Sequence, residues 1–133
     1  MIDLAKKGVG TCINAPADMG PEVKKIPVVD CDKEHTHEIF AVVPYVEQVA
    51  GQPDKATDVF PGLEALDAFA QRACIAEFEG YVGISAFDSA LTFSWLTPTL
   101  ASWNSAAKDR KVICVLGMFN GDTLNRSMAQ AKL

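Results

Sequence analysis

Apolar residues gather in short runs over the first third of the chain, in the pattern of half-buried strands bounded by turn residues. Strands are predicted over residues 8–14, 26–31 and 37–44, and residues 45–62 form a connection without a sustained period. Few residues separate the second strand from the third, whereas a parallel crossover needs about a dozen or more. The sequence therefore predicts an antiparallel hairpin over residues 26–44.

A helical period follows between residues 62 and 80, where apolar side chains gather on one side and charged side chains on the other. Strands are again predicted over residues 91–96 and 111–119, with a short helical turn around Trp103 between them. The C-terminal tail, residues 121–133, is expected to be loosely ordered at its end. The strand over 111–119 is apolar on both faces, which is typical of the centre of a sheet. The predicted fold is α+β: an antiparallel sheet of four to five strands with one main helix packed on one face. The predicted apolar side of the helix carries Leu63, Leu66, Phe69, Ala70, Ala73, Cys74 and Tyr81.

The length of 133 residues is typical of one domain, which we expect to span residues 1–133 with a core over about 8–124. The net charge of -5, without a cluster of lysine or arginine, argues against binding to nucleic acid or to an anionic membrane surface. The apolar runs are too short to cross a membrane, so we expect no membrane insertion by this chain. Its first residues also lack the apolar core of a signal peptide, although a parent protein could carry one.

Four cysteines without a CxxC pair favour two structural disulfides over a zinc ribbon or a redox motif. Cys74 lies on the apolar side of the predicted helix, and Cys114 aligns with inward-facing residues of the predicted central strand. A Cys74–Cys114 bond would link the helix to the sheet, and a Cys12–Cys31 bond would link the first two strands. The sequence allows three pairings, of which this one is preferred.

The segment CDKEHTHEIF, residues 31–40, contains the residues most suited to chemistry. On a strand, His35 and His37 would point to the same face, a geometry that zinc accepts. Cys31 or Asp32 could add a third ligand, and Glu34 or Glu38 could act as the base. This alternative describes a zinc-binding module or a zinc-dependent hydrolase. However, Cys31 cannot ligate zinc from within a disulfide, and the chain has no other histidine. We therefore interpret the segment as a disulfide-anchored hairpin turn and expect no metal.

Other patterns of enzymes or ligand-binding proteins are weak. No GxSxG elbow, phosphate-binding loop or suitably placed pair of carboxylates occurs, so we expect no catalytic residue and no cofactor. Trp95 and Trp103 could line a ligand groove, which leaves a small-ligand sensor domain as a further alternative. Large aromatic side chains of a small domain more often belong to its core.

Five short blocks follow one another along the chain: GVGTCIN, IPVVDC with HEIFAVV, FEGYVG, PTLASW and KDRKVICVLG. In this order they resemble the septum-formation family domain of actinobacterial-type envelope proteins, over residues 8 to about 124. The residues that match the family are Cys12, Cys31, Cys74, Cys114, His35, Glu38 and Trp103. This chain departs from the family pattern at Glu34, where a proline is common, and at His37, an extra histidine.

The resemblance implies an extracytoplasmic domain, secreted or anchored on the outer face of the cytoplasmic membrane, with paired cysteines and no established activity. The family name suggests a link to cell division. Our first hypothesis is a non-enzymatic domain that binds an envelope protein or a cell-wall component.

Overall fold

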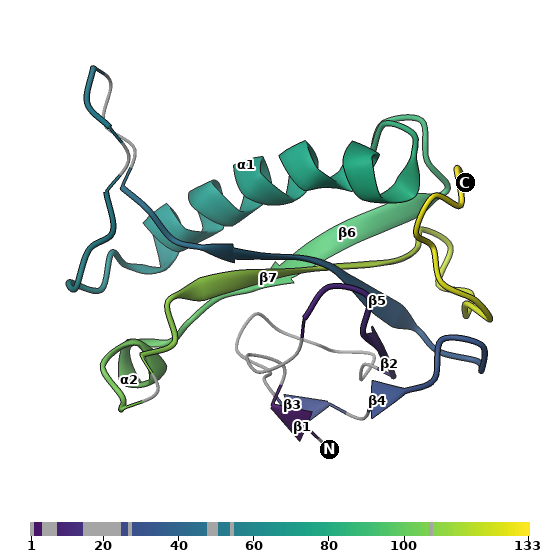
Figure 1. Cartoon of the computed structure of the whole chain (residues 1–133), viewed down its shortest axis with the longest axis horizontal. Coiled ribbons are helices and arrows are strands. Elements are labelled where there is room, and N and C mark those ends of the chain that lie inside the picture. The colour runs from purple at the N-terminus through teal and green to yellow at the C-terminus, as the bar shows by residue number, and fades with distance from the viewer. Residues whose placement is uncertain are drawn as a thin grey trace.

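Five antiparallel strands form the main sheet of the molecule, and one long helix covers one of its faces (Figure 1). The computed structural model of the chain describes residues 2–3, 8–14, 25–26, 28–47, 51–53, 55–106 and 108–133. A separate two-stranded sheet pairs β1 (Ile2–Asp3) with β3 (Lys25–Ile26). In order across the main sheet, the strands are β4 (Val28–Val29), β2 (Cys12–Ile13), β5 (His37–Pro44), β7 (Lys111–Met118) and β6 (Leu91–Leu96).

Strand β7 lies between β5 and β6, and its sequence explains this central place. All residues from 112 to 117 are buried, so side chains on both of its faces are covered. Cys114 and Leu116 pack toward the helix, whereas Ile113 and Val115 pack on the opposite face of the sheet. The predicted α+β fold with a central strand at 111–119 is confirmed.

The predicted hairpin over residues 26–44 is wrong in its pairing. Strand β2 lies between β4 and β5 and pairs with both, so that Cys12 is opposite Val29 on one side and Glu38 on the other. Cys12 and Ile13 are both buried, and a short buried strand needs neighbours at both edges to satisfy its backbone groups. Residues 30–36 cross the distance of two strand spacings, about 10 Å.

Helix α1 (Leu63–Val82) packs its apolar side on the sheet. The side chains buried along it are those of Leu66, Phe69, Ala70, Cys74, Phe78 and Val82, whereas Leu63, which the period placed on the same side, is exposed. The helix ends at Gly83, whose backbone is left-handed with φ 97°. A Cβ atom there would also lie 2.9 Å from Cγ of Lys132. Both the left-handed backbone and this close approach therefore favour glycine.

Both predicted disulfides are present, with the preferred pairing. Cys74–Cys114 joins α1 to β7 beneath the helix, and both sulfur-bearing residues are completely buried. Cys12–Cys31 joins β2 to the turn that follows β4. The sheet is therefore covalently linked to the helix on one side and to its own edge on the other.

The C-terminal segment is packed on the domain, so the expected loose tail is wrong. Leu124 and Met128 are buried in the same apolar cluster as Phe78 and Val82 of α1. The backbone N–H groups of residues 130 and 132 donate to the carbonyls of residues 81 and 82 at the end of α1. In Figure 1 this segment, drawn in yellow, runs beside the C-terminal end of α1.

Candidate functional site

A group of polar side chains, two of them completely buried and two half-buried, lies where β5, the end of α1 and the C-terminal segment meet. We call it the polar centre and define it by the side chains of His35, Glu38, Tyr81 and Ser127 with the backbone N–H of Met128. Glu38 is the second residue of β5, directly before an apolar run, and its side chain is completely buried. A buried carboxylate is stable only with hydrogen-bond donors or a positive charge around it.

Three donors from distant parts of the chain surround the Glu38 carboxylate. The Tyr81 hydroxyl, on the last turn of α1, donates to Oε2, and the Ser127 hydroxyl donates to the same oxygen at 3.1 Å. The N–H of Met128 donates to Oε1 at 3.1 Å. Such charge-assisted hydrogen bonds are stronger than those between neutral groups. Glu38 thereby holds β5, α1 and the C-terminal segment together.

The environment of Tyr81 shifts the pKa of its hydroxyl. Burial raises the pKa of its hydroxyl well above the ordinary value of 10.0, and the hydrogen bond to Glu38 and the charge of that carboxylate raise it further. Tyr81 therefore remains protonated over the physiological pH range and acts as a donor. Its role at the site is to stabilise the Glu38 carboxylate.

His35 completes the polar centre on the side of the turn. Its Nδ1 lies 2.7 Å from the carbonyl oxygen of Lys33, and since a carbonyl can only accept, Nδ1 carries the proton. Its Nε2 lies 3.9 Å from Oε1 of Glu38 and has no hydrogen-bond partner among the described residues. An imidazole beside a carboxylate could exchange protons with a substrate. Here both side chains are 0% exposed, which leaves no access for one.

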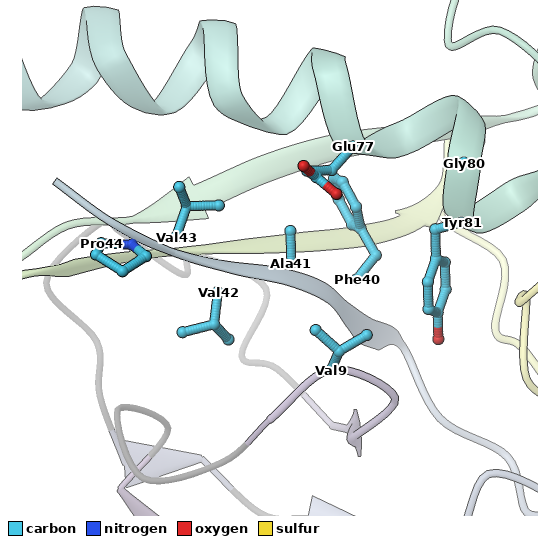
Figure 2. Close-up of a pocket in the computed structure, with 9 residues that line it drawn as sticks. All are labelled: Val9, Phe40, Ala41, Val42, Val43, Pro44, Glu77, Gly80 and Tyr81. Atoms are coloured by element: carbon cyan, nitrogen blue, oxygen red, sulfur yellow. The ribbon is translucent and has the colours of Figure 1, made fainter. Parts of the chain in front are cut away.

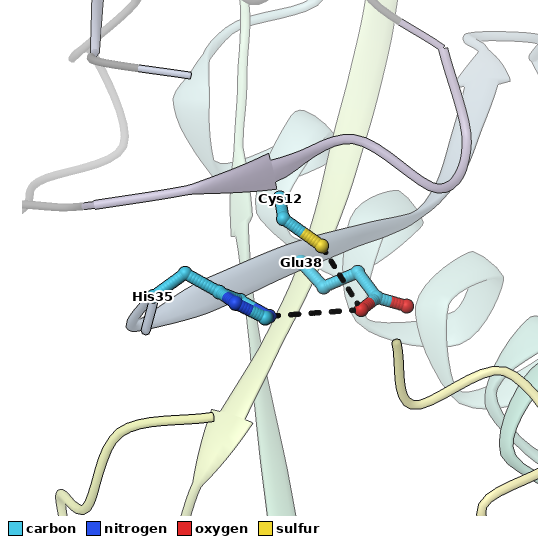
Figure 3. A group of neighbouring side chains, drawn as sticks. All are labelled: Cys12, His35 and Glu38. Atoms are coloured by element: carbon cyan, nitrogen blue, oxygen red, sulfur yellow. Dashed lines mark hydrogen bonds and ion pairs between the residues drawn. The ribbon is translucent and has the colours of Figure 1, made fainter. Parts of the chain in front are cut away.

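Cys12, His35 and Glu38 bring three ligand atoms within 4.8 Å of one another, the single group of this kind found among the described residues (Figure 3). Sγ of Cys12 lies 3.3 Å from Oε1 of Glu38, but it belongs to the disulfide with Cys31. A zinc ligand of this type must be a thiolate. In the oxidised protein, one imidazole and one carboxylate are therefore left as zinc ligands. Zinc sites in proteins use three or four protein ligands.

His37 does not join this group. Its imidazole lies against Gly117 of β7, where a Cβ atom would approach His37 Cδ2 to 2.9 Å, and its Nδ1 lies 3.0 Å from the Thr36 hydroxyl. Burial lowers the pKa of His37, and the charge of His35 lowers it further. The two imidazoles that would share a zinc ion in the zinc-binding alternative are thus directed to different partners.

The two tryptophans are part of the packed structure. Trp103, in α2 (Leu100–Trp103), is completely buried and donates from its indole N–H to the carbonyl of Asp58 at 3.0 Å. Arg110 lies over its ring, 5.2 Å from the centroid. Trp95 on β6 is half-buried and donates to the carboxylate of Asp67 on α1. The structure places Trp103 in the core and Trp95 against α1.

A cavity of about 550 Å³ opens between β5 and the end of α1 (Figure 2). Its lining is mostly apolar, and Glu77 supplies its charged group. The ring of Tyr81 forms part of the wall, while its hydroxyl is bonded to Glu38. Among its described residues, the lining contains no pair of acid and base side chains. The lining residues are Val9, Phe40, Ala41, Val42, Val43, Pro44, Glu77, Gly80 and Tyr81.

Sequence reasoning identified His35 and Glu38 but missed Tyr81, Ser127 and the N–H of Met128 as their partners. These contacts join residues 43, 89 and 90 positions apart, and no local pattern signals contacts at such separations. The one available sign was a carboxylate within an apolar strand, because a buried charge implies donors elsewhere in the fold.

Comparison with known proteins gives one family. No curated protein and no solved structure matched the chain. Among the described residues, no helix is both long enough and apolar enough to cross a membrane. The family described as septum formation matches residues 9–132, which includes every strand of the main sheet, both helices and all four cysteines. The chain therefore belongs to the septum-formation family.

Proposed function

We propose that this chain is a non-enzymatic, extracytoplasmic domain of a cell-envelope protein that binds another protein or a cell-wall component during septum formation. The observation that carries the proposal is the pair of disulfides in a domain of the septum-formation family. Structural disulfides persist in oxidising compartments and are rare in the cytosol. A small domain also gains from them the stability that a limited core cannot supply.

The distribution of reactive and apolar groups supports binding over chemistry. His35 and Glu38, the side chains best suited to acid–base catalysis, are buried in the polar centre and bonded to the domain itself. By contrast, Phe87 and Phe119 are exposed apolar side chains that line the same groove. Exposed apolar residues that gather on a surface are typical of binding sites.

The experiment follows the full-length protein in dividing cells that encode it. In one sample, acid quenching and alkylation trap any free thiols. In a parallel sample of living cells, the protein is crosslinked from photoreactive residues placed at exposed positions. We expect all four cysteines to be oxidised and crosslinks to an envelope protein or to cell-wall material that are enriched in cells with forming septa. Free cysteines, or crosslinks that are equally abundant in non-dividing cells, would reject the proposal.

A further inference from the structure

Strand β6 forms one edge of the main sheet, and part of its backbone faces outward. The N–H of Phe119 donates to the carbonyl of Ala90, directly before β6. This bond shows which opposite residues of β6 and β7 are hydrogen-bonded pairs and which are non-bonded pairs. Because bonded and non-bonded pairs alternate in an antiparallel ladder, Thr92 and Ser94 bond to β7. The N–H and C=O groups of Phe93 and Trp95 therefore point away from β7 and have no partner among the described residues.

The edge lacks the features that usually protect such strands. Natural edge strands carry charges, prolines or bulges that prevent pairing with another chain. The residues of β6 read LTFSWL, without a charge or a proline, and the pairing of β6 with β7 runs without a register shift. This edge is open to the addition of a further strand.

A groove of about 400 Å³ runs along the same edge, between β6 and α1. Ile75 of α1 forms one wall, and Leu91 and Phe93 of β6 form another. Phe87 and Phe119 stand at its rim and are 86% and 80% exposed. Alternate side chains of an added strand would point toward this groove, which suits a large apolar side chain.

Charge around the groove indicates which partner fits it. Residues 60–96, which form α1, the following loop and β6, contain five acidic residues and one basic residue. Asp88 follows Phe87 directly, and Glu79 lies one helical turn beyond Ile75. The basic residue, Arg72, already has an interaction partner. We call Glu79 and Asp88 the acidic rim of the groove. A second copy of this chain would bring the same acidic rim, whereas a segment with lysine or arginine beside its apolar residues would be attracted.

We infer that the outer edge of β6 binds an extended segment of another protein as an additional strand. An apolar side chain of that segment occupies the groove, and basic residues beside it face the acidic rim. The inference rests on the proposed function and specifies its binding surface.

The test uses the oxidised, purified domain and a library of random peptides displayed on phage. Enriched peptides should alternate apolar and polar residues and carry lysine or arginine at their ends. In the complex with a synthetic copy of an enriched peptide, the amide hydrogens of Phe93 and Trp95 should become protected from exchange. Those of Thr92 and Ser94, already bonded to β7, should change little. Failure to enrich such peptides, or binding that leaves Phe93 and Trp95 unprotected, would overturn the inference.

Exposed phenylalanines provide the variant and its matched control. The double substitution Phe87→Ser and Phe119→Ser should weaken peptide binding by about tenfold or more, because two apolar contacts are lost. Val59→Ser removes an apolar residue that is 73% exposed outside the groove, and binding should stay within about twofold of the wild type. Equal effects of the two changes, or dimerisation of the free domain through β6, would count against the inference.

The experiments can reject the proposed function and the proposed binding surface independently of each other. If septal crosslinking persists in the Phe87→Ser and Phe119→Ser variant, the proposed function holds and β6 is rejected as its surface. If peptides bind β6 as expected but the protein does not crosslink at septa, the surface holds and the septal role is rejected.

Discussion

The Tyr81→Phe substitution tests whether the polar centre holds the domain together. The change removes one oxygen atom and leaves the ring, so that the Glu38 carboxylate loses the donor on α1 and keeps those from Ser127 and Met128. A hydrogen bond to a charged group contributes about 1.5 to 3 kcal/mol. The buried site gives water little access to replace the donor, because Glu38 is completely buried. We expect the free energy of unfolding to fall by about this amount.

Tyr45→Phe is the matched control for this substitution. The ring of Tyr45 packs against Phe69 and Trp103. Among the described residues, its hydroxyl has no hydrogen-bond partner. Removing it should change the free energy of unfolding by less than about 0.5 kcal/mol, as measured by urea unfolding of the oxidised proteins. If Tyr81→Phe costs no more than Tyr45→Phe, the polar centre does not stabilise the fold in the way described.

The same tyrosine gives a pH dependence with a definite sign. The pKa of Tyr81 is raised in the folded state, while the unfolded chain releases this proton near its ordinary value of 10.0. Above that pH the unfolded state binds fewer protons than the folded state, so stability falls as pH rises. The difference in unfolding free energy between the wild type and Tyr81→Phe should therefore shrink above pH 10. A difference that stays constant there would show that the hydroxyl titrates normally.

Further predictions concern the disulfides and His37. Replacing both Cys74 and Cys114 by alanine should cost about 3.9 kcal/mol from loop entropy alone, against about 3.2 for Cys12 and Cys31, for sequence separations of 40 and 19. Urea unfolding measures both losses, and a larger loss for the Cys12–Cys31 pair would contradict this order. The pKa of His37 is lowered by burial, so its contribution to stability is present above the unfolded value of 6.5 and is lost as pH falls through the folded value. In His37→Gln the loss of stability between pH 7.5 and pH 5 should be smaller than in the wild type, and an equal loss would exclude this role.

Local patterns were sufficient for the parts of the fold that depend on periodicity. The apolar period of α1 and the double-sided apolar pattern of β7 placed Cys74 and Cys114 on facing surfaces, and this placement predicted their disulfide.

Contacts between distant residues could not be predicted in the same way. The position of β2 between β4 and β5 depends on which strands meet in space, and sequence spacing alone favoured the simpler hairpin. The partners of Glu38 come from α1 and from a segment near the C-terminus that appeared polar and loose. The exposure of Phe87 and Phe119 could not be predicted either, because an apolar residue next to a strand is more often buried.

The most direct test of the account is the intact mass of the protein released from its native envelope at neutral pH, without a reducing agent and in a volatile buffer that retains bound metal. The account predicts a chain that lacks four hydrogens relative to its fully reduced form, two for each disulfide, and carries no metal ion. A mass that corresponds to free Cys12 and Cys31 with one bound zinc ion would contradict it, because Cys12, His35 and Glu38 would then form a metal centre.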